Sequence, residues 1–183
     1  MYKIRGIIEG VAPILFHGWT AEAKRKLDEG ITGGKMSIRD KEEEAKGYVH
    51  RDGNGGVCLP FKCFKACLLE GARMARLKET GRISIVPYLR ATLFSASREF
   101  SFGREDVDYV DMDIVRIKGA PAIRRRPALN AGWLIPFTLV VYDDRRNPDQ
   151  IKKALESAGL IVGLLDHRPE YGRFMVKEWE VDR

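Results

Sequence analysis

The chain has 183 residues, of which 44% are hydrophobic and 32% are charged, and this size and composition suit one globular domain with a strongly charged surface. Its 32 basic and 26 acidic side chains give a net charge of +6 and a pI of about 9.3, which favours polyanions such as nucleic acid. No signal-peptide pattern and no run of about 18 apolar residues is present, so we expect a cytoplasmic protein without a membrane partner.

The first predicted element is a strand. Within residues 2–10, hydrophobic and charged residues alternate as they do in a half-buried strand. The segment 20–52 is polar and has too few apolar residues for a core of its own, so we interpret it as a projecting insertion. Pro60 is a typical first residue of a helix, and apolar residues then recur at helical spacing over 61–75.

The rest of the chain contains further strand-like and helix-like segments. ISIVPYL at 83–89, ATLF at 91–94 and DIVRIKG at 113–119 favour strands, and a second insertion is expected at about 95–112. WLIPFTLVVY at 133–142 is the strongest strand signal, with Pro136 near its start. The later elements are a helix capped by Asn147, with Pro148 in its first turn, and a final strand at 173–181.

In chain order these elements approach a βαββαβ plan with extra strands. We therefore predict one α+β domain over 1–183, with a ferredoxin-like, RRM-like core, an antiparallel sheet and two inserted projecting segments. Two helices would cover one face of the sheet and leave the other face open. In RRM-type modules, single-stranded nucleic acid commonly lies across that open face.

The first candidate binding site is a basic run without an intervening acid. Guanidinium groups bind phosphates through paired hydrogen bonds, and such contacts supply most sequence-independent affinity for nucleic acid. The alternative interpretation is a solvated strand end and loop. The residues are Arg116, Lys118, Arg124, Arg125 and Arg126.

The second candidate is the glycine-bounded segment GLLDHRPEYGRF at 163–174. Glycine lets the backbone approach a ligand closely, arginine can bind phosphate, and a histidine or tyrosine ring can stack on a base. The candidate contacts are His167, Arg168, Tyr171 and Arg173. Alternatively, the segment is a turn that closes the sheet, with Arg168 paired to Asp166 or Glu170.

The segment at 163–174 resembles the C-terminal glycine-rich loop of the RAMP superfamily. Within it, the chain is most similar to the backbone proteins that coat CRISPR guide RNA and to short phage-encoded relatives. The opening strand with EGVAPILF and the LPFKCFKACLLEGAR segment also match, whereas the family's Ser-Ser-x-Lys/Arg-Gly turn is replaced by Phe61–Ala66.

This resemblance implies a non-catalytic, RNA-binding subunit of a ribonucleoprotein complex in antiviral defence. Its partners would be single-stranded guide RNA, target nucleic acid, copies of itself and other subunits. Lys62 and Lys65, on the first helix, would lie near the RNA, and the insertions would grip RNA and neighbouring subunits. Weaker candidate contacts are Trp19, for stacking, and Lys24, Arg25, Lys26 and Lys35.

His17 supports an alternative function. It follows the first strand, where RAMP processing nucleases carry an acid–base histidine, so a metal-independent endoribonuclease stays open. Such chemistry needs a partner, for which Tyr171, His50 and Lys35 are candidates. The structural alternative is a packed histidine, and a third possibility is a phage assembly protein with protein partners only.

We predict no metal and no cofactor. Cys58, Cys63 and Cys67 lack the paired knuckles of a zinc site, so we expect reduced thiols in the core. The acidic cluster of Glu105, Asp106, Asp108, Asp111 and Asp113 lacks the spacing of a calcium loop. We interpret it as an acidic patch that meets the basic patch of a neighbouring copy.

Overall fold

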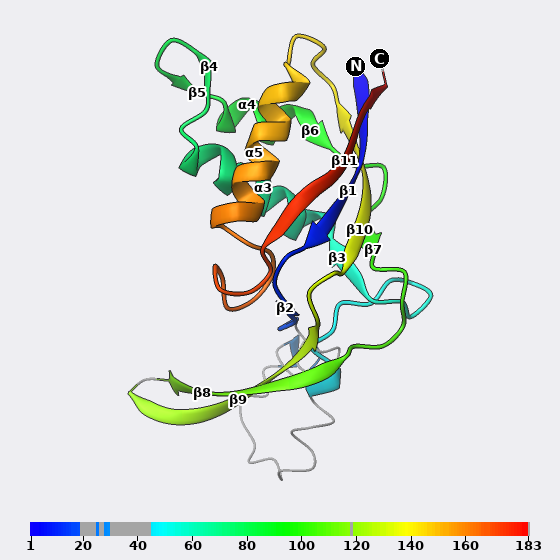
Figure 1. Cartoon of the computed structure of the whole chain (residues 1–183), viewed down its shortest axis with the longest axis vertical. Coiled ribbons are helices and arrows are strands. Elements are labelled where there is room, and N and C mark those ends of the chain that lie inside the picture. The colour runs from blue at the N-terminus through cyan, green and yellow to red at the C-terminus, as the bar shows by residue number, and fades with distance from the viewer. Residues whose placement is uncertain (19–24, 26–27, 30–44, 118, 183) are drawn as a thin grey trace.

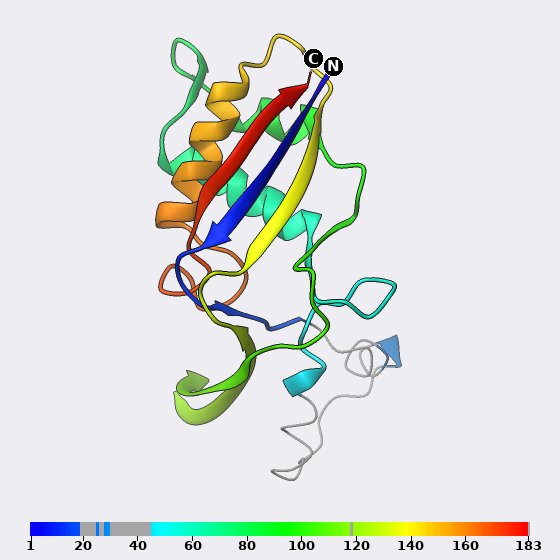
Figure 2. The ribbon, with the colours of Figure 1, turned by 45° about the vertical axis from the view of Figure 1, so that its right-hand side comes forward.

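A computed structural model describes residues 1–18, 25, 28–29, 45–117 and 119–182. Its centre is a four-stranded antiparallel sheet with the order β11-β1-β10-β6. These strands are β1 (Tyr2–Gly10), β6 (Leu93–Phe94), β10 (Leu134–Val141) and β11 (Phe174–Asp182). The helices α3 (Phe61–Met74) and α5 (Pro148–Ile161) cover one face (Figures 1 and 2). The predicted α+β class and βαββαβ order are confirmed.

The strand β1 is central because its alternating pattern gives it one apolar face. Ile4 and Ile8 are fully buried under the helices, whereas Lys3 and Arg5, on either side of Ile4, are exposed. Hydrogen bonds pair β1 with β10 on one side and with β11 on the other. The N- and C-terminal ends therefore lie side by side at one end of the molecule (Figure 1).

The two covering helices pack closely through small residues. A Cβ atom on Gly71 of α3 would lie 2.3 Å from the Ala154 carbonyl oxygen of α5, so a larger residue would push the helices apart. The Asn147 side chain accepts a hydrogen bond from the Asp149 N–H and caps α5, as the sequence predicts. These helices and the sheet enclose the main core.

The predicted strand at 83–89 is wrong. Only Ile83–Ser84 (β5) is extended, paired with Lys78–Thr80 (β4), and Val86–Thr92 forms the helix α4. Pro87 cannot donate to a strand ladder, but its fixed φ suits the first helical turn. The buried Ile85 and Leu89, one turn apart, attach this segment to the core.

A long hairpin projects from the end of the molecule opposite the termini (Figure 1). It consists of β8 (Tyr109–Ile117) and β9 (Ala120–Leu129), and β9 also pairs with β2 (Ile14–Leu15). The predicted 95–112 insertion overlaps β8 and the short strand β7 (Glu99–Ser101), which pairs with β3 (Cys58–Pro60). Most of 20–52 lies outside the described residues, so the boundaries of both insertions stay a prediction.

The three cysteines are free thiols, and Cys58 and Cys67 are buried. The Cys67 thiol donates a hydrogen bond to the Gly163 carbonyl at 3.1 Å, and burial raises its pKa to about 12. Burial, together with Glu99, likewise raises the pKa of Cys58 to about 12. Both thiols are therefore protonated core groups and not nucleophiles. Within the described parts of the chain, no helix has the length and apolar character needed to cross a bilayer.

Candidate nucleic-acid interface

Two adjoining hollows run along the exposed side of α3. One, of about 690 Å³, lies between α3, the end of α5 and residues 163–172, here called the C-terminal loop. The other, of about 510 Å³, lies between α3 and α4. Both are lined by Ala66, Glu70 and Arg73, so the two hollows adjoin, and we call them together the α3 groove.

Basic side chains from three elements line the α3 groove. They are Lys62, Lys65 and Arg73 of α3, Arg90 of α4 and Arg168 of the C-terminal loop. Two acids also line it, but Glu70 accepts from Arg73 at 2.5 Å and Asp166 accepts from Arg126 at 2.6 Å. Lys62, Arg90 and Arg168 are exposed, and no acid of the described residues lies within ion-pair distance of them. The groove therefore carries positive charge that the acids of the described residues do not neutralise.

Lys65 has a structural role that the sequence did not predict. Its ammonium group donates to the carbonyls of Arg90 at 2.8 Å and Leu93 at 2.6 Å, and lies 4.6 Å from the centre of the Phe94 ring. Burial lowers its pKa, and the Arg90 charge lowers it further. Lys65 thus joins α3 to the end of α4, and is not the free ammonium that an RNA contact would need.

The C-terminal loop is fixed by two glycines in the left-handed region, Gly163 (φ 77°) and Gly172 (φ 73°). The Leu164 N–H donates to the Gly172 carbonyl at 2.9 Å, and a Cβ atom on Gly172 would lie 2.0 Å from the Leu164 carbonyl oxygen. The Asp166 N–H donates to the Leu15 carbonyl of β2 at 3.2 Å. The loop is therefore held between α3 and the base of the hairpin.

The predicted contact residues of this loop face different ways. Arg168 and His167 line the α3 groove, and the His167 ring lies 5.2 Å from the Tyr171 ring, centre to centre. Tyr171 is half-buried, so it offers less surface to a base than predicted. Arg173 is exposed next to β11, and its carbonyl accepts from Val11 at 2.9 Å.

The three consecutive arginines of β9 do not form one patch. Alternation along the strand places Arg124 and Arg126 on one face of the hairpin and Arg125 on the other. Arg126 is only 5% exposed; its Nε donates to Asp166 at 2.6 Å, and a second nitrogen lies 3.9 Å from Asp111. This side chain is therefore an internal link between the hairpin and the C-terminal loop, and its phosphate contact stays a prediction.

Several acids of the cluster at 105–113 lie near basic side chains of the same chain. Asp111 lies across the hairpin from Arg126, and Asp113 lies across from Arg124. Asp108 accepts from the Arg104 guanidinium at 2.6 Å and from the Asn130 N–H at 2.8 Å. Asp108 and Asp111 thus have partners within the chain, and the patch for a neighbouring copy stays a prediction. Among the residues placed by the structure, no cluster of three or more His, Cys, Asp or Glu side chains could hold a metal ion.

A second polar cluster lies beside the middle of the hairpin. The Arg124 guanidinium donates to His17 Nε2 at 3.2 Å, and the His17 ring lies 4.8 Å from the Tyr48 ring, centre to centre. His17 is exposed. These are not the partners predicted for His17, and no motif in the sequence singled out Tyr48, which lies in the segment interpreted as an insertion.

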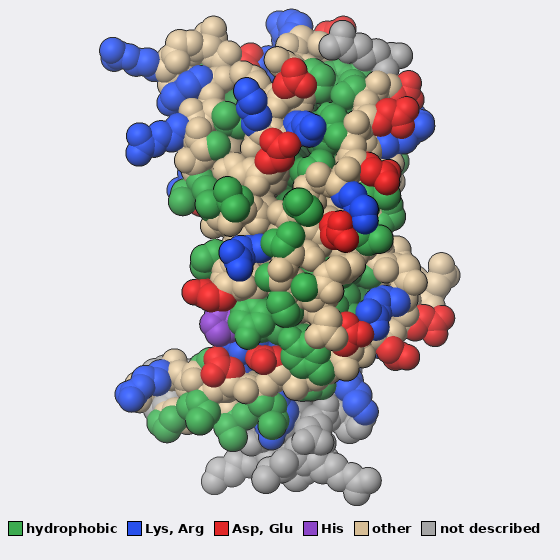
Figure 3. All heavy atoms as spheres, in the orientation of Figure 1, with side chains coloured by type: hydrophobic (Ala, Val, Ile, Leu, Met, Phe, Trp, Pro, Cys, Tyr) green, Lys and Arg blue, Asp and Glu red, His purple; other side chains and the backbone are tan. Residues whose placement is uncertain are grey.

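The remaining candidates are dispersed. Arg116 is exposed near the tip of the hairpin, where hydrophobic side chains of β8 and β9 also gather at the surface (Figure 3). Arg25 pairs with Glu29 at 3.0 Å. Several predicted contacts lie outside the described residues: Trp19, Lys24, Lys26, Lys35 and Lys118.

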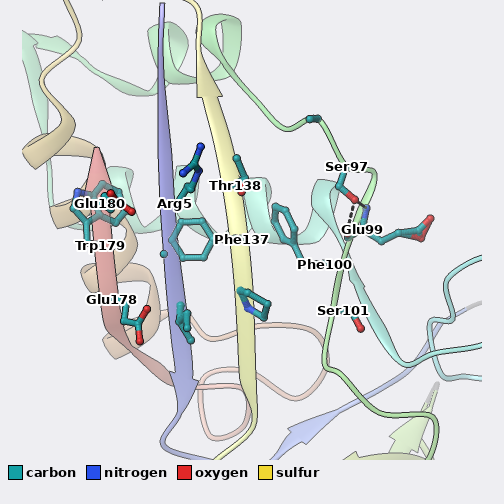
Figure 4. Close-up of a pocket in the computed structure, with 14 residues that line it drawn as sticks. Arg5, Ser97, Glu99, Phe100, Ser101, Phe137, Thr138, Glu178, Trp179 and Glu180 are labelled. Carbon is teal, nitrogen blue, oxygen red and sulfur yellow. Dashed lines mark hydrogen bonds between the residues drawn. The ribbon is translucent and has the colours of Figure 1, made fainter. Parts of the chain in front are cut away.

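The open face of the sheet is not basic. A shallow pocket of about 880 Å³ lies on this face (Figure 4). Its lining includes Arg5 of β1 and Glu178 and Glu180 of β11. Arg5 pairs with Asp182 at 3.2 Å, and Lys177 pairs with Glu9 at 3.1 Å. Carboxylates repel phosphates, so the expectation that nucleic acid lies across this face is not supported.

Neither a protein-family model nor a curated protein sequence matches the chain. Among solved structures, it is similar to a chain of the cryo-EM structure of the Type III-B Cmr-beta bound to cognate target RNA. The TM-score is 0.55 at 15% sequence identity, and the match covers 100% of this chain and 61% of that chain. The chain thus spans less than two thirds of that protein's length. The likeness concerns the fold alone.

Proposed function

We propose that this chain is an RNA-binding subunit of a ribonucleoprotein complex, which holds single-stranded RNA by its phosphates in the α3 groove. The observation that carries the proposal is the convergence of Lys62, Arg90 and Arg168 from three separate elements, without paired acids. Unpaired cations in adjoining hollows bind a polyanion in a sequence-independent way. The fold likeness to a chain of an RNA-bound complex supports the same class of ligand.

The finer form of the proposal follows from the C-terminal loop, which resembles that of RAMP backbone proteins. In this form the ligand is a guide RNA, and the partners are copies of the chain and other subunits of the complex. The C-terminal loop would contact the RNA through Arg168, while Arg126 and Asp166 hold the loop against the hairpin. The chain would act as a coat without catalysis.

The proposal is tested by filter binding of the purified chain to a single-stranded RNA between 50 and 200 mM salt. If three phosphates are contacted, a plot of the logarithm of the binding constant against the logarithm of the salt concentration should have a slope of about −2, since each phosphate of a single strand contributes ~0.7. Arg168→Ala should weaken binding about tenfold, because a charge-assisted hydrogen bond is lost. Arg5→Ala, on the open face of the sheet, is the matched control and should leave affinity unchanged. The proposal would be contradicted if the affinity for RNA did not depend on the salt concentration, or if Arg168→Ala and Arg5→Ala lowered it equally.

A metal-independent endoribonuclease is the second candidate, favoured by the contact of His17 with Arg124 and Tyr48. When the Arg124 guanidinium turns from His17 to the attacked phosphate, Nε2 of a neutral His17 can accept the proton of a 2′-hydroxyl, and the guanidinium can stabilise the charge that develops on the phosphate.

This activity is tested with stem-loop RNA in EDTA. Cleavage products that disappear with His17→Ala and with Arg124→Ala would support the nuclease. Intact RNA after prolonged incubation with the wild-type chain would leave only the coating function. The matched control is Arg116→Ala, an exposed arginine near the hairpin tip, which should not affect cleavage.

A further inference from the structure

Two aromatic rings are exposed where α4 meets the edge strand β6. The Phe94 side chain is 42% exposed and that of Tyr142 is 63% exposed, and their ring centres lie 5.4 Å apart at an interplanar angle of 81°. Phe94 pairs with Val140 of β10, and the Tyr142 N–H donates to the Thr92 carbonyl at 3.0 Å. The backbone thus fixes both residues at one corner of the molecule.

A cation supports the Phe94 ring. The Lys65 ammonium lies 4.6 Å from the centre of the Phe94 ring, and the carbonyls of Arg90 and Leu93 hold it there. A cation over a ring face is attractive, and more so when it is partly desolvated. Phe94 is therefore held between Lys65 and Tyr142, and the more exposed Tyr142 ring offers its surface to a ligand.

This corner is continuous with the α3 groove. Lys65 and Arg90 line the groove between α3 and α4, and the same Lys65 contacts Phe94. An RNA strand whose phosphates follow the α3 groove past Arg90 would bring its next nucleotide to the rings of Phe94 and Tyr142. Exposed rings beside a row of cations are the usual arrangement for holding unpaired bases, because every base has a flat face that can stack.

We propose that Tyr142, supported by Phe94, is a stacking platform for an unpaired nucleobase of single-stranded RNA. This inference rests on the proposed function, since the phosphates of the same strand occupy the α3 groove. The platform would accept any of the four bases, because stacking needs no hydrogen-bond readout.

The test uses a single-stranded RNA that carries 2-aminopurine, whose fluorescence falls when it stacks. Wild-type protein should quench the probe, and Tyr142→Leu should abolish the quenching and weaken binding about tenfold. The salt slope of Tyr142→Leu should match that of the wild type, because no phosphate contact is lost. Tyr142→Phe should keep the quenching, and Met175→Ala, an equally exposed apolar side chain on β11, should change nothing.

The outcomes separate the two proposals. Wild-type binding with quenching that persists in both Tyr142→Leu and Phe94→Leu would overturn the platform and leave the α3 groove standing. No RNA binding by the wild type would overturn the groove, and the platform with it. Because Tyr142 is an exposed side chain, the circular dichroism melt of Tyr142→Leu should match that of the wild type.

Discussion

Replacing Arg126 by alanine is expected to lower the free energy of unfolding by about 3 kcal/mol, the usual loss when one partner of a buried ion pair is removed. Arg126 is 5% exposed, and its Nε donates to Asp166 at 2.6 Å. Its loss leaves two half-buried carboxylates, Asp166 and Asp111, without their shared cation. It also frees the hairpin from the C-terminal loop. Urea unfolding followed by circular dichroism measures the change.

Two further variants separate charge from packing. Asp166→Asn should cost a similar amount, because it leaves the Arg126 charge buried beside Asp111 alone. Arg126→Met should cost less than Arg126→Ala, since it keeps an apolar stem in the same space. Arg145→Ala removes an arginine whose side chain is 81% exposed, and it should leave the midpoint of urea unfolding unchanged. If Arg126→Ala matched Arg145→Ala, the internal link would be refuted.

The same ion pair predicts a pH dependence. Burial by itself raises the pKa of Asp166, but the hydrogen bond and charge of Arg126, aided by the His167 N–H, outweigh burial and hold the pKa below its ordinary value. A lowered pKa in the folded state adds stability that is present above the ordinary carboxyl pKa of about 3.9 and is lost as pH falls through the lower value. The stability difference between wild type and Arg126→Ala should therefore shrink below about pH 4.

The largest effect on RNA binding is expected from removing all three unpaired groove cations together. The variant with Lys62, Arg90 and Arg168 changed to Gln should bind single-stranded RNA at least ~100-fold more weakly at low salt. The slope of its log binding constant against log salt concentration should be smaller in magnitude by about 2. Each of these side chains would otherwise displace one counterion from a phosphate. Filter binding over the same salt range as for the wild type gives both quantities.

A control of equal charge decides whether position matters. Lys3, Arg5 and Lys177 lie on or beside the open face of the sheet, and changing them to Gln also removes three positive charges. The α3-groove account predicts a loss of less than about tenfold for this control, from the weaker overall field alone. Equal losses in both triple variants would mean that net charge, and not the groove, sets the affinity.

The main elements were predictable because their patterns are local. Alternation marks β1, helical spacing after Pro60 marks α3, and the Asn147 cap marks α5. The helix α4 was missed because β-branched residues before Pro87 suggest a strand, whereas the proline and the contacts of Leu89 with the core favour a helical turn.

The candidate site was only partly predictable, because it depends on tertiary contacts. Arg168 and Lys62 were identified from sequence, but Arg90 lies between the two segments predicted as strands at 83–89 and 91–94, and three elements must fold before these cations meet. The basic run of β9 does not form one patch, since a strand sends neighbouring side chains to opposite faces and Arg126 meets an acid forty residues away, as its contact with Asp166 shows. The charge of the open sheet face likewise depends on which strands pair.

The location of bound RNA tests the central claim most directly. Ultraviolet crosslinking of the wild-type chain to single-stranded RNA, followed by mass spectrometry of the peptides, reports which surface the strand touches. We predict adducts within 61–74, 86–94 and 163–173, the segments that form and border the α3 groove, and at Tyr142 if the stacking platform holds. Adducts confined to 3–9 and 175–182, on the open face of the sheet, would contradict the account.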